Sequence, residues 1–221
     1  WSCCSLFALG LTLLYAAVDL GGSSGRVTVG QLKDEKILLT EVHRFKHEPI
    51  QTKDGLFWDW QFLVEQVITG LKAATKLGRI HSVGIDSWAV DYGLIDKSGA
   101  VISQPYCYRD ARTDGVMAKL KEELGVDYIY SKTGIQFIFF NTMYQLFIEK
   151  ESTAYKNADK FLMVPDLLNY LLCGSISTEI TNASTTQSMK ARSLALTCRF
   201  GGKARYIGMG VMCQSSNSGS N

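Results

Sequence analysis

The sequence predicts a mixed α/β domain whose sheet contains an antiparallel meander. Alternating or apolar segments at 15–20, 26–32 and 37–45 are separated only by short turns, which is typical of three consecutive strands. A helical pattern follows, and then an apolar segment at 80–86 that predicts a further, buried strand. Because the first strand leads into another strand and not into a helix, we expect the sheet to combine antiparallel and other pairings.

The composition is that of an ordinary globular protein. The 221 residues are 46% hydrophobic and 20% charged, with a net charge of +2, which excludes a disordered chain and gives no reason to expect a nucleic-acid partner. The six cysteines form no CxxC pair, so we expect reduced thiols, no zinc site and a cytoplasmic location. Residues 1–18 carry no charge but are interrupted by polar residues, and we expect no membrane span.

The segments after the meander alternate between helical and strand patterns. Asp59 precedes an amphipathic run and is expected to cap a helix that continues to about Leu77. Pro165 suits the first turn of a later helix, and Gly174 suits its C-terminal cap. The other predicted elements are strands at 80–86 and 89–95 and helices at 112–124, 142–149 and 165–172.

The turn after the first strand has the composition of an anion site. In this glycine turn (Gly21–Gly25) the glycines permit several backbone N–H groups to point the same way, while serine hydroxyls and Arg26 add donors and charge. Asp19, just before the turn, is suited to hold Mg²⁺ through water, and the cation would bridge to phosphates. The alternative is a glycine-rich hairpin without a ligand. The spacing matches neither GxxxxGK[ST] nor GxGxxG, which disfavours Walker-type and dinucleotide sites.

Six segments, in the same order, resemble the FGGY carbohydrate kinases, within the wider sugar kinase, actin and heat-shock ATPase superfamily. The likeness runs from about Tyr15 to Gln187, and within the family it points to the L-rhamnulose kinases. Gly22 stands where alanine would be expected. The segments are VDLGGSSGR (18–26), GIDSWAVDYGLID (84–96), YRDART (108–113), GIQFIFFNTMYQL (134–146), MVPDLLNYLLCG (163–174) and TEITNASTTQ (178–187).

The resemblance implies an ATP-dependent kinase that phosphorylates the primary hydroxyl at carbon 1 of L-rhamnulose. It implies a ribonuclease H-like fold, with a second similar domain closing over the nucleotide. It also implies site residues. The ATP phosphates would face Gly22, Ser23, Ser24, Gly25 and Arg26, Mg²⁺ would lie near Asp19, and the sugar would contact Ala89, with Trp88, Asp91 and Asn141 nearby.

The residues themselves leave some of these roles open. Trp88 could offer an aromatic face to a sugar or pack in the core, and Asp86 could be a turn cap. The segment Tyr108-Arg109-Asp110 is either a substrate-side loop or a surface ion pair. The sequence does not decide between these alternatives.

The resemblance divides the chain into three parts: an N-terminal extension (1–14), an incomplete kinase domain (15–187) and a divergent tail (188–221). The family's general base is an aspartate downstream of the last matching segment, whereas no acidic residue follows Glu179. We therefore expect a fragment without the catalytic base and without the C-terminal domain that would be its packing partner, unable to turn over substrate by itself. The alternatives are a non-catalytic sugar- or partner-binding module, or a kinase for L-fuculose, xylulose or glycerol.

Overall fold

The computed structural model describes residues 13–188 and 211–213. The predicted extension and the predicted tail lie almost wholly outside the described residues, so the division of the chain remains a prediction. None of the helices in the described part has the length and apolar character needed to cross a bilayer.

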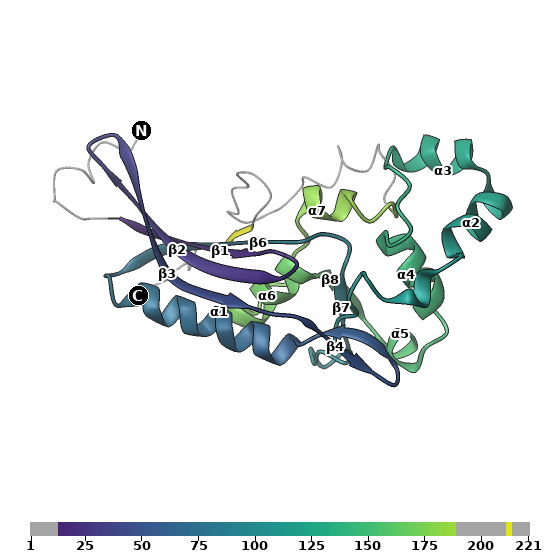
Figure 1. Cartoon of the computed structure of the whole chain (residues 1–221), viewed down its shortest axis with the longest axis horizontal. Helices are drawn as coiled ribbons and strands as arrows, with labels where there is room; N and C mark the ends of the chain where they lie inside the picture. Colours follow the sequence, from purple (N-terminus) through teal and green to yellow (C-terminus); the bar gives the residue numbers. More distant parts are fainter. Residues whose placement is uncertain (1–12, 189–210, 214–221) are drawn as a thin grey trace, which may run out of the picture.

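The fold is built on a five-stranded mixed sheet with the strand order β3-β2-β1-β6-β9 (Figure 1). The predicted meander is confirmed as β1 (Leu14–Leu20), β2 (Ser24–Lys33) and β3 (Lys36–Lys46), paired antiparallel. Strand β6 (Ile80–Ser87) then lies parallel to β1, and β9 (Val211–Cys213) pairs antiparallel with β6. The parallel pairing places the ends of β1 and β6 side by side, with Asp19 opposite Asp86.

Helices cover one face of this sheet. The predicted cap is confirmed, because the Asp59 side chain accepts from the amide of Phe62 at the start of α1 (Trp60–Thr75). Figure 1 shows α1 and α6 (Val164–Cys173) on the same side of the sheet. Their buried side chains form one core with the covered face of the strands. Apolar side chains at every second strand position meet one apolar stripe per helix, which is why this side is buried.

The opposite face of the sheet is open in the described residues. Ala17 is exposed there, and a Cβ placed on Gly84 would meet no atom within 4 Å. Asp19 and Asp86 end the two central strands, and both are accessible to solvent. Helices therefore fix the strands from one side while the carboxyl ends of β1 and β6 stay accessible.

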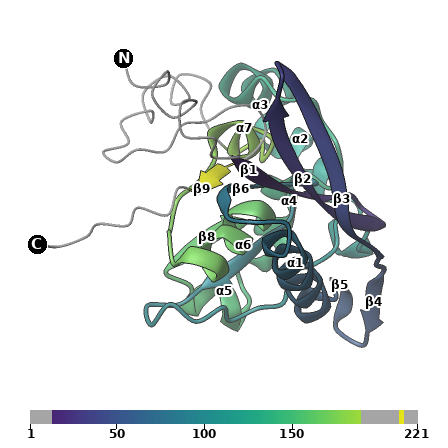
Figure 2. The same ribbon diagram turned by 90° about the vertical axis from the view of Figure 1, so that its left-hand side faces the viewer.

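The remaining elements surround the ends of the sheet. The β4–β5 hairpin and the antiparallel pair β7–β8 are separate two-stranded sheets, and α2 to α4 gather away from the β2–β3 hairpin tip. Seen from the end, β9 lies beside β6 (Figure 2). These elements are β4 (Pro49–Thr52), β5 (Gly55–Trp58), β7 (Tyr92–Ile95), the 3-10 turn η2 (Ala111–Thr113), α2 (Val116–Leu124), α3 (Val126–Thr133), α4 (Thr142–Glu149), α5 (Thr153–Asn157), β8 (Lys160–Met163) and α7 (Ile180–Ser184).

Two predicted elements differ from the structure. The strand expected at 89–95 begins only at Tyr92, because the backbone at Val90 has φ of 71° and cannot continue a strand. The helix expected at 112–124 is divided into η2 and α2 by Gly115, which has φ of 77°. Helices α4 and α6 are close to their predicted bounds, and Gly174 is the left-handed C-cap of α6 as expected.

Candidate functional site

The glycine turn is held so that its carbonyl groups face protein donors. The carbonyl of Gly21 accepts from His47 Nε2 at 2.8 Å, and that of Gly22 accepts from Arg109 Nη2 at 3.2 Å. The carbonyl of Ser23 accepts from the His47 amide at 3.1 Å, and that of Ser24 accepts from the Gly21 amide at 2.8 Å. The carbonyls of Gly21, Gly22, Ser23 and Ser24 are therefore all satisfied within the protein.

Two amide groups of the turn are in the opposite situation. Those of Gly22 and Ser23 have no acceptor among the described residues, and Ser23 is exposed. Adjacent unpaired N–H groups on an exposed turn form a positive concavity suited to a phosphate oxygen. Gly25 maintains the close packing below them, because a Cβ there would lie 2.7 Å from the Leu20 side chain and closer still to the Phe45 ring.

Two carboxylates lie beside the turn. Asp19 forms an ion pair with Arg26, with 2.6 Å between Oδ2 and Nη2, and both side chains are nearly half exposed. Burial, with the neighbouring Asp19 and Glu179 adding to it, raises the pKa of Asp86. Mg²⁺ commonly keeps its waters and uses one or two carboxylates. The exposed Asp19 fits that role beside a phosphate, although no group of three or more potential metal ligands gathers among residues 13–188 and 211–213.

An aromatic wall borders the turn; it consists of Trp58, Trp88, Tyr108 and Phe140. The rings of Trp58 and Trp88 lie 4.2 Å apart between centroids, and Tyr108 lies 5.1 Å from Phe140. Trp58 is fully buried, whereas the other three are partly accessible. The wall touches the turn directly, since a Cβ on Gly22 would lie 3.0 Å from the Tyr108 hydroxyl.

A buried carboxylate holds the wall together. Asp91 is fully buried, and its Oδ2 accepts from the indole N–H groups of Trp58 at 2.6 Å and Trp88 at 3.0 Å. The same oxygen accepts from the Tyr108 amide at 3.1 Å, while Oδ1 accepts from Gln145. Burial raises the pKa of Asp91 to about 6. Asp91 therefore fixes three members of the neighbourhood at once and has no exposed atom to offer a ligand.

The loop that carries Trp88 and Ala89 is strained. Val90 has φ of 71°, which is unfavourable for a β-branched residue. Its carbonyl is held from α4, by the Thr142 hydroxyl at 2.7 Å and by Gln145 Nε2 at 3.3 Å. Strain of this kind persists only where the surroundings enforce it, and it occurs most often at functional sites.

The restraint on this loop extends to a buried ion pair. Arg112 donates to Gln145 Oε1 at 2.8 Å, lies over the Tyr106 ring at 3.6 Å and faces Glu149 at 3.4 Å. Tyr92 also donates to Glu149. Gln145 thus connects Arg112 to both Asp91 and Val90, and the loop conformation depends on residues more than 50 positions away in the sequence.

The structure brings most of the predicted site residues into one neighbourhood. Gly22 to Arg26 and Asp19 border the open end of β1, and Trp88 belongs to the wall, with Ala89 next to it, partly accessible. Asp91 and Asn141 lie behind, fully or almost fully buried. Asn141 donates to the Gln136 carbonyl and to Gln187 Oε1, so both residues contact protein groups in place of solvent.

Sequence reasoning missed several neighbours of the site: His47, Trp58, Arg112, Thr142 and Gln145. Arg112, Thr142 and Gln145 lie inside segments that resemble the family, and this position in the sequence could have indicated that they belong to the site. His47 and Trp58 lie outside them, and only the tertiary contacts identify these two residues. Tyr108 and Arg109, whose role the sequence left open, border the turn and the wall.

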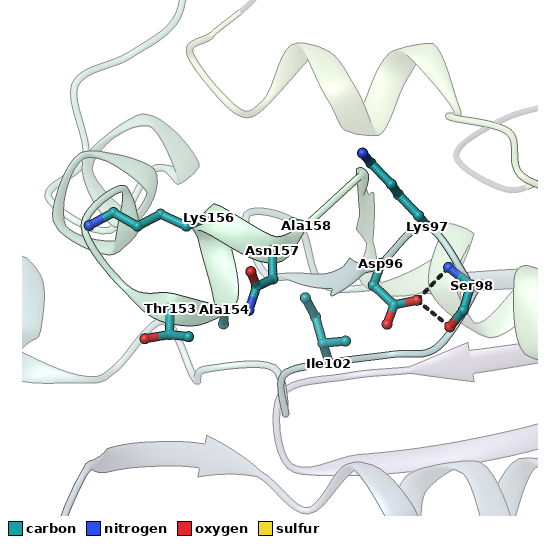
Figure 3. A pocket seen from close by; sticks show the side chains of 9 residues that line it. All are labelled: Asp96, Lys97, Ser98, Ile102, Thr153, Ala154, Lys156, Asn157 and Ala158. Atoms are coloured by element: carbon teal, nitrogen blue, oxygen red, sulfur yellow. Dashed lines mark hydrogen bonds between the residues drawn. The ribbon is translucent and has the colours of Figure 1, made fainter.

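A separate groove lies between the segment after β7 and α5 (Figure 3). At its rim Asp96 accepts from both the amide and the hydroxyl of Ser98. The groove shares no residue with the turn or the wall. Its lining residues are Asp96, Lys97, Ser98, Ile102, Thr153, Ala154, Lys156, Asn157 and Ala158.

The mixed sheet, its one-sided helices and the turn at the end of β1 define the fold class of the sugar kinases. The crystal structure of gluconate kinase from Lactobacillus acidophilus matches 83% of this chain and 38% of its own, with a TM-score of 0.74 and 17% identity. Xylulose kinase from the same organism matches 82% of this chain and 37% of its own, with a TM-score of 0.72 and 18% identity. At such identities the likeness establishes the fold alone.

The sequence comparisons define the family. Residues 14–196 match the model of the N-terminal domain of the FGGY family of carbohydrate kinases, and the chain belongs to that family. A rhamnulokinase from Mannheimia succiniciproducens is 50% identical over 177 residues, which cover 78% of this chain. One from Bacillus subtilis is 47% identical over 176 residues, which cover 79%. The chain spans only 37% and 36% of the length of these two relatives.

Proposed function

We propose that this domain serves an ATP-dependent kinase that transfers a phosphoryl group to the 1-hydroxyl of L-rhamnulose. The observation that carries the proposal is the turn geometry: its carbonyls are bound to the protein, and its Gly22 and Ser23 amides are free beside an aromatic wall. A phosphate cradle next to an aromatic face is what transfer from a nucleotide to a sugar requires.

The nucleotide half of the site is assigned to the turn. The free amides, the hydroxyls of Ser23 and Ser24 and the Arg26 side chain would contact the ATP phosphates, with Gly22 and Gly25 allowing the close approach. Asp19 would hold Mg²⁺ through water, and the ion would supply charge neutralisation at the phosphates. For Arg26 and Asp19 to act in this way, their mutual ion pair has to open or be shared with the ligand.

The sugar half is assigned to the sugar-side loop, residues 88–91. Trp88 would lie against the apolar side of the sugar, and the small side chain of Ala89 would allow close contact. Asp91 and Asn141 are proposed to act indirectly, since both are buried and bonded to protein groups. In this proposal Asp91 fixes the indole of Trp88, and Asn141 fixes the start of α4.

The reaction forms a bond between the sugar oxygen and the γ-phosphorus and breaks the bond from that phosphorus to the ADP oxygen. The hydroxyl proton has to pass to a general base, which the family resemblance puts downstream of Gln187. Positioning and charge stabilisation supply most of the catalysis in such transfers. The contribution of this domain is accordingly to hold the sugar in line with the terminal phosphate.

The choice of L-rhamnulose is supported by the relatives, because curated rhamnulokinases are 43–50% identical over about 180 residues. A cytoplasmic location belongs to the same proposal, since ATP is the phosphate donor.

Binding and turnover test the proposal. L-rhamnulose, L-fuculose, xylulose and glycerol are titrated into the purified chain while tryptophan emission is recorded, and ADP release from Mg-ATP is measured with the complete protein. We expect L-rhamnulose to bind most tightly and to give the highest kcat/KM. Equal responses to all four sugars, or none to any, would contradict it. Leu77→Ala, at an exposed position near the end of α1 far from the wall, is the matched control variant.

A further inference from the structure

His47 lies between the glycine turn and the aromatic wall, and neither the family match nor the proposed function gives it a role. It follows β3 in the chain and is 5% exposed. Its amide donates to the Ser23 carbonyl at 3.1 Å, and its Nε2 lies 2.8 Å from the Gly21 carbonyl. A carbonyl only accepts, so Nε2 carries the proton.

The other side of the same ring contacts the wall. Its centroid lies 5.5 Å from that of Trp58, edge to face, and 5.7 Å from that of Trp88. A third ring, Phe45, lies 6.1 Å away. Rings at these separations are in van der Waals contact in a close-packed interior, so a shift of one is transmitted to the next.

The two hydrogen bonds from His47 restrain alternate carbonyls of the turn. In a trans peptide the N–H points opposite to the C=O, so the Gly21 carbonyl directed to His47 turns the Gly22 amide away from His47. The Ser23 amide lies in the peptide plane of the Gly22 carbonyl instead. Arg109 restrains the carbonyl of Gly22 from the side of the wall. Of these two side chains, Arg109 is exposed and His47 is buried, so His47 is the more rigid restraint.

We propose that His47 is a positioning residue that couples the glycine turn to the aromatic wall. Through the Nε2 hydrogen bond it keeps the turn in its anion-binding conformation, and through ring contact it transmits occupancy of the turn to Trp58 and Trp88. By linkage, an anion on the turn and a sugar on the wall alter each other's affinity by the same factor. The proposal rests on the proposed function of the two halves.

The test uses tryptophan emission as a readout of the wall and magnesium tripolyphosphate as a probe of the turn, since the latter requires no adenine site. In the unmodified chain we expect tripolyphosphate to change the emission and to alter the affinity for L-rhamnulose. His47→Phe keeps a ring but removes the donor. We expect it to weaken tripolyphosphate binding roughly three- to tenfold, the size of one net hydrogen bond, and to abolish the effect on sugar affinity.

Conservative and matched variants separate positioning from general destabilisation. His47→Gln keeps a side-chain N–H at similar reach and should restore most of the tripolyphosphate affinity. His81→Phe makes the same chemical change near the start of β6, where the ring lies edge to face with Tyr15 and not against the turn or the wall, and should leave both ligands unaffected. If the phenylalanine variant of His47 does not fold, His47→Leu removes the same donor with a smaller side chain.

The outcomes distinguish the two proposals. If the unmodified chain binds neither ligand, both proposals fail. If it binds both and His47→Phe and His47→Leu bind as the unmodified chain does, with the mutual effect intact, the role of His47 is refuted and the proposed function stands. If His47→Gln behaves like His47→Phe, the hydrogen bond is not the cause, and the positioning role is likewise refuted.

Discussion

The glycine turn and the sugar-side loop follow neighbouring parallel strands, and the protein fixes their conformations in different ways. The turn between β1 and β2 is short and made of glycine and serine, and its carbonyls are held by the Gly21 amide, by the amide and ring of His47 and by the Arg109 side chain. The loop after β6 is partly or fully buried, contains the strained Val90 and is held by side chains from α4 and by the Tyr108 amide, which donates to Asp91. The presence of the turn is therefore encoded locally, whereas the orientation of its carbonyls and the loop conformation require the rest of the domain.

The largest expected effect is the loss of the carboxylate at the centre of the loop. Asp91→Ala leaves two indole N–H groups and the Tyr108 amide without their acceptor inside the protein. We expect a loss of about 3–5 kcal/mol in unfolding free energy, measured by urea denaturation. As the control, Asp19→Ala, at the exposed end of β1, should change stability by less than about 1 kcal/mol. Equal losses of unfolding free energy in the two variants would show that the loop does not depend on a buried carboxylate more than the turn does on an exposed one.

The second effect is a pH dependence of stability to which the loop carboxylate contributes. Burial raises the pKa of Asp91 to about 6, above its value in the unfolded chain, so the folded state favours the protonated form. Its contribution to stability is full below about pH 4 and is lost as the pH rises through about 6, by roughly 1–3 kcal/mol. Unfolding free energies measured from pH 4 to pH 8 should show this fall in the unmodified protein, and Asp91→Asn should flatten it.

Asp166 contributes a slope of the same sign, because burial raises its pKa to about 7. Asp166→Asn is therefore needed as the companion variant, and the double variant should show the flattest profile. A profile that is unchanged by Asp91→Asn would show that the loop carboxylate does not titrate in this range.

A third prediction concerns packing beneath the turn. Gly25→Ala places a Cβ against Leu20 and the Phe45 ring, and we expect a loss of about 1–3 kcal/mol from overpacking. Gly84→Ala, on β6 of the same sheet, places its Cβ in open space and should leave the unfolding free energy unchanged or slightly higher. Thermal unfolding of the two variants measures the difference in their stability. An unchanged stability of Gly25→Ala would mean that Leu20 and Phe45 can move to accommodate the added methyl group.

The smallest effect on stability is expected at Arg109, which connects the two regions from outside. Arg109→Met removes the exposed bond to the Gly22 carbonyl and a positive charge beside the turn. We expect tripolyphosphate affinity to fall two- to fivefold while the unfolding free energy changes by less than about 0.5 kcal/mol. Arg109→Lys keeps the charge and should lose less affinity, and titration calorimetry compares the two. An unchanged affinity in Arg109→Met would exclude a contribution of Arg109 to the turn.

The two regions also differ in how well the sequence predicts them. Alternation, glycine and Asp59 were sufficient for the meander, the turn and α1, because these elements depend on contacts close in sequence. The sequence did not reveal the β4–β5 hairpin, α3, α5, β8 and α7, which are short and stabilised by their neighbours. It extended the strand after β6 too far, since nothing local at Val90 indicates a positive φ.

The sequence indicated which types of residue belong to the candidate site, but it did not indicate which of them form hydrogen bonds with one another. Trp88 and Asp91 were selected by their residue types and by the family likeness. The hydrogen bond between them is evident only in the folded loop. His47 was missed because its role follows from two carbonyls that lie more than 20 residues earlier in the chain.

The sequence by itself determined the family, the order of the main strands and the presence of a glycine-rich turn after the first strand, because strand periodicity and glycine content act over a few residues. Only the tertiary structure decided that the turn's carbonyls face inward, that Asp91 is buried behind the wall and that one face of the sheet is open in the described residues. These features depend on which distant donors meet which acceptors, and the burial of unpaired polar groups costs too much free energy for other arrangements to persist.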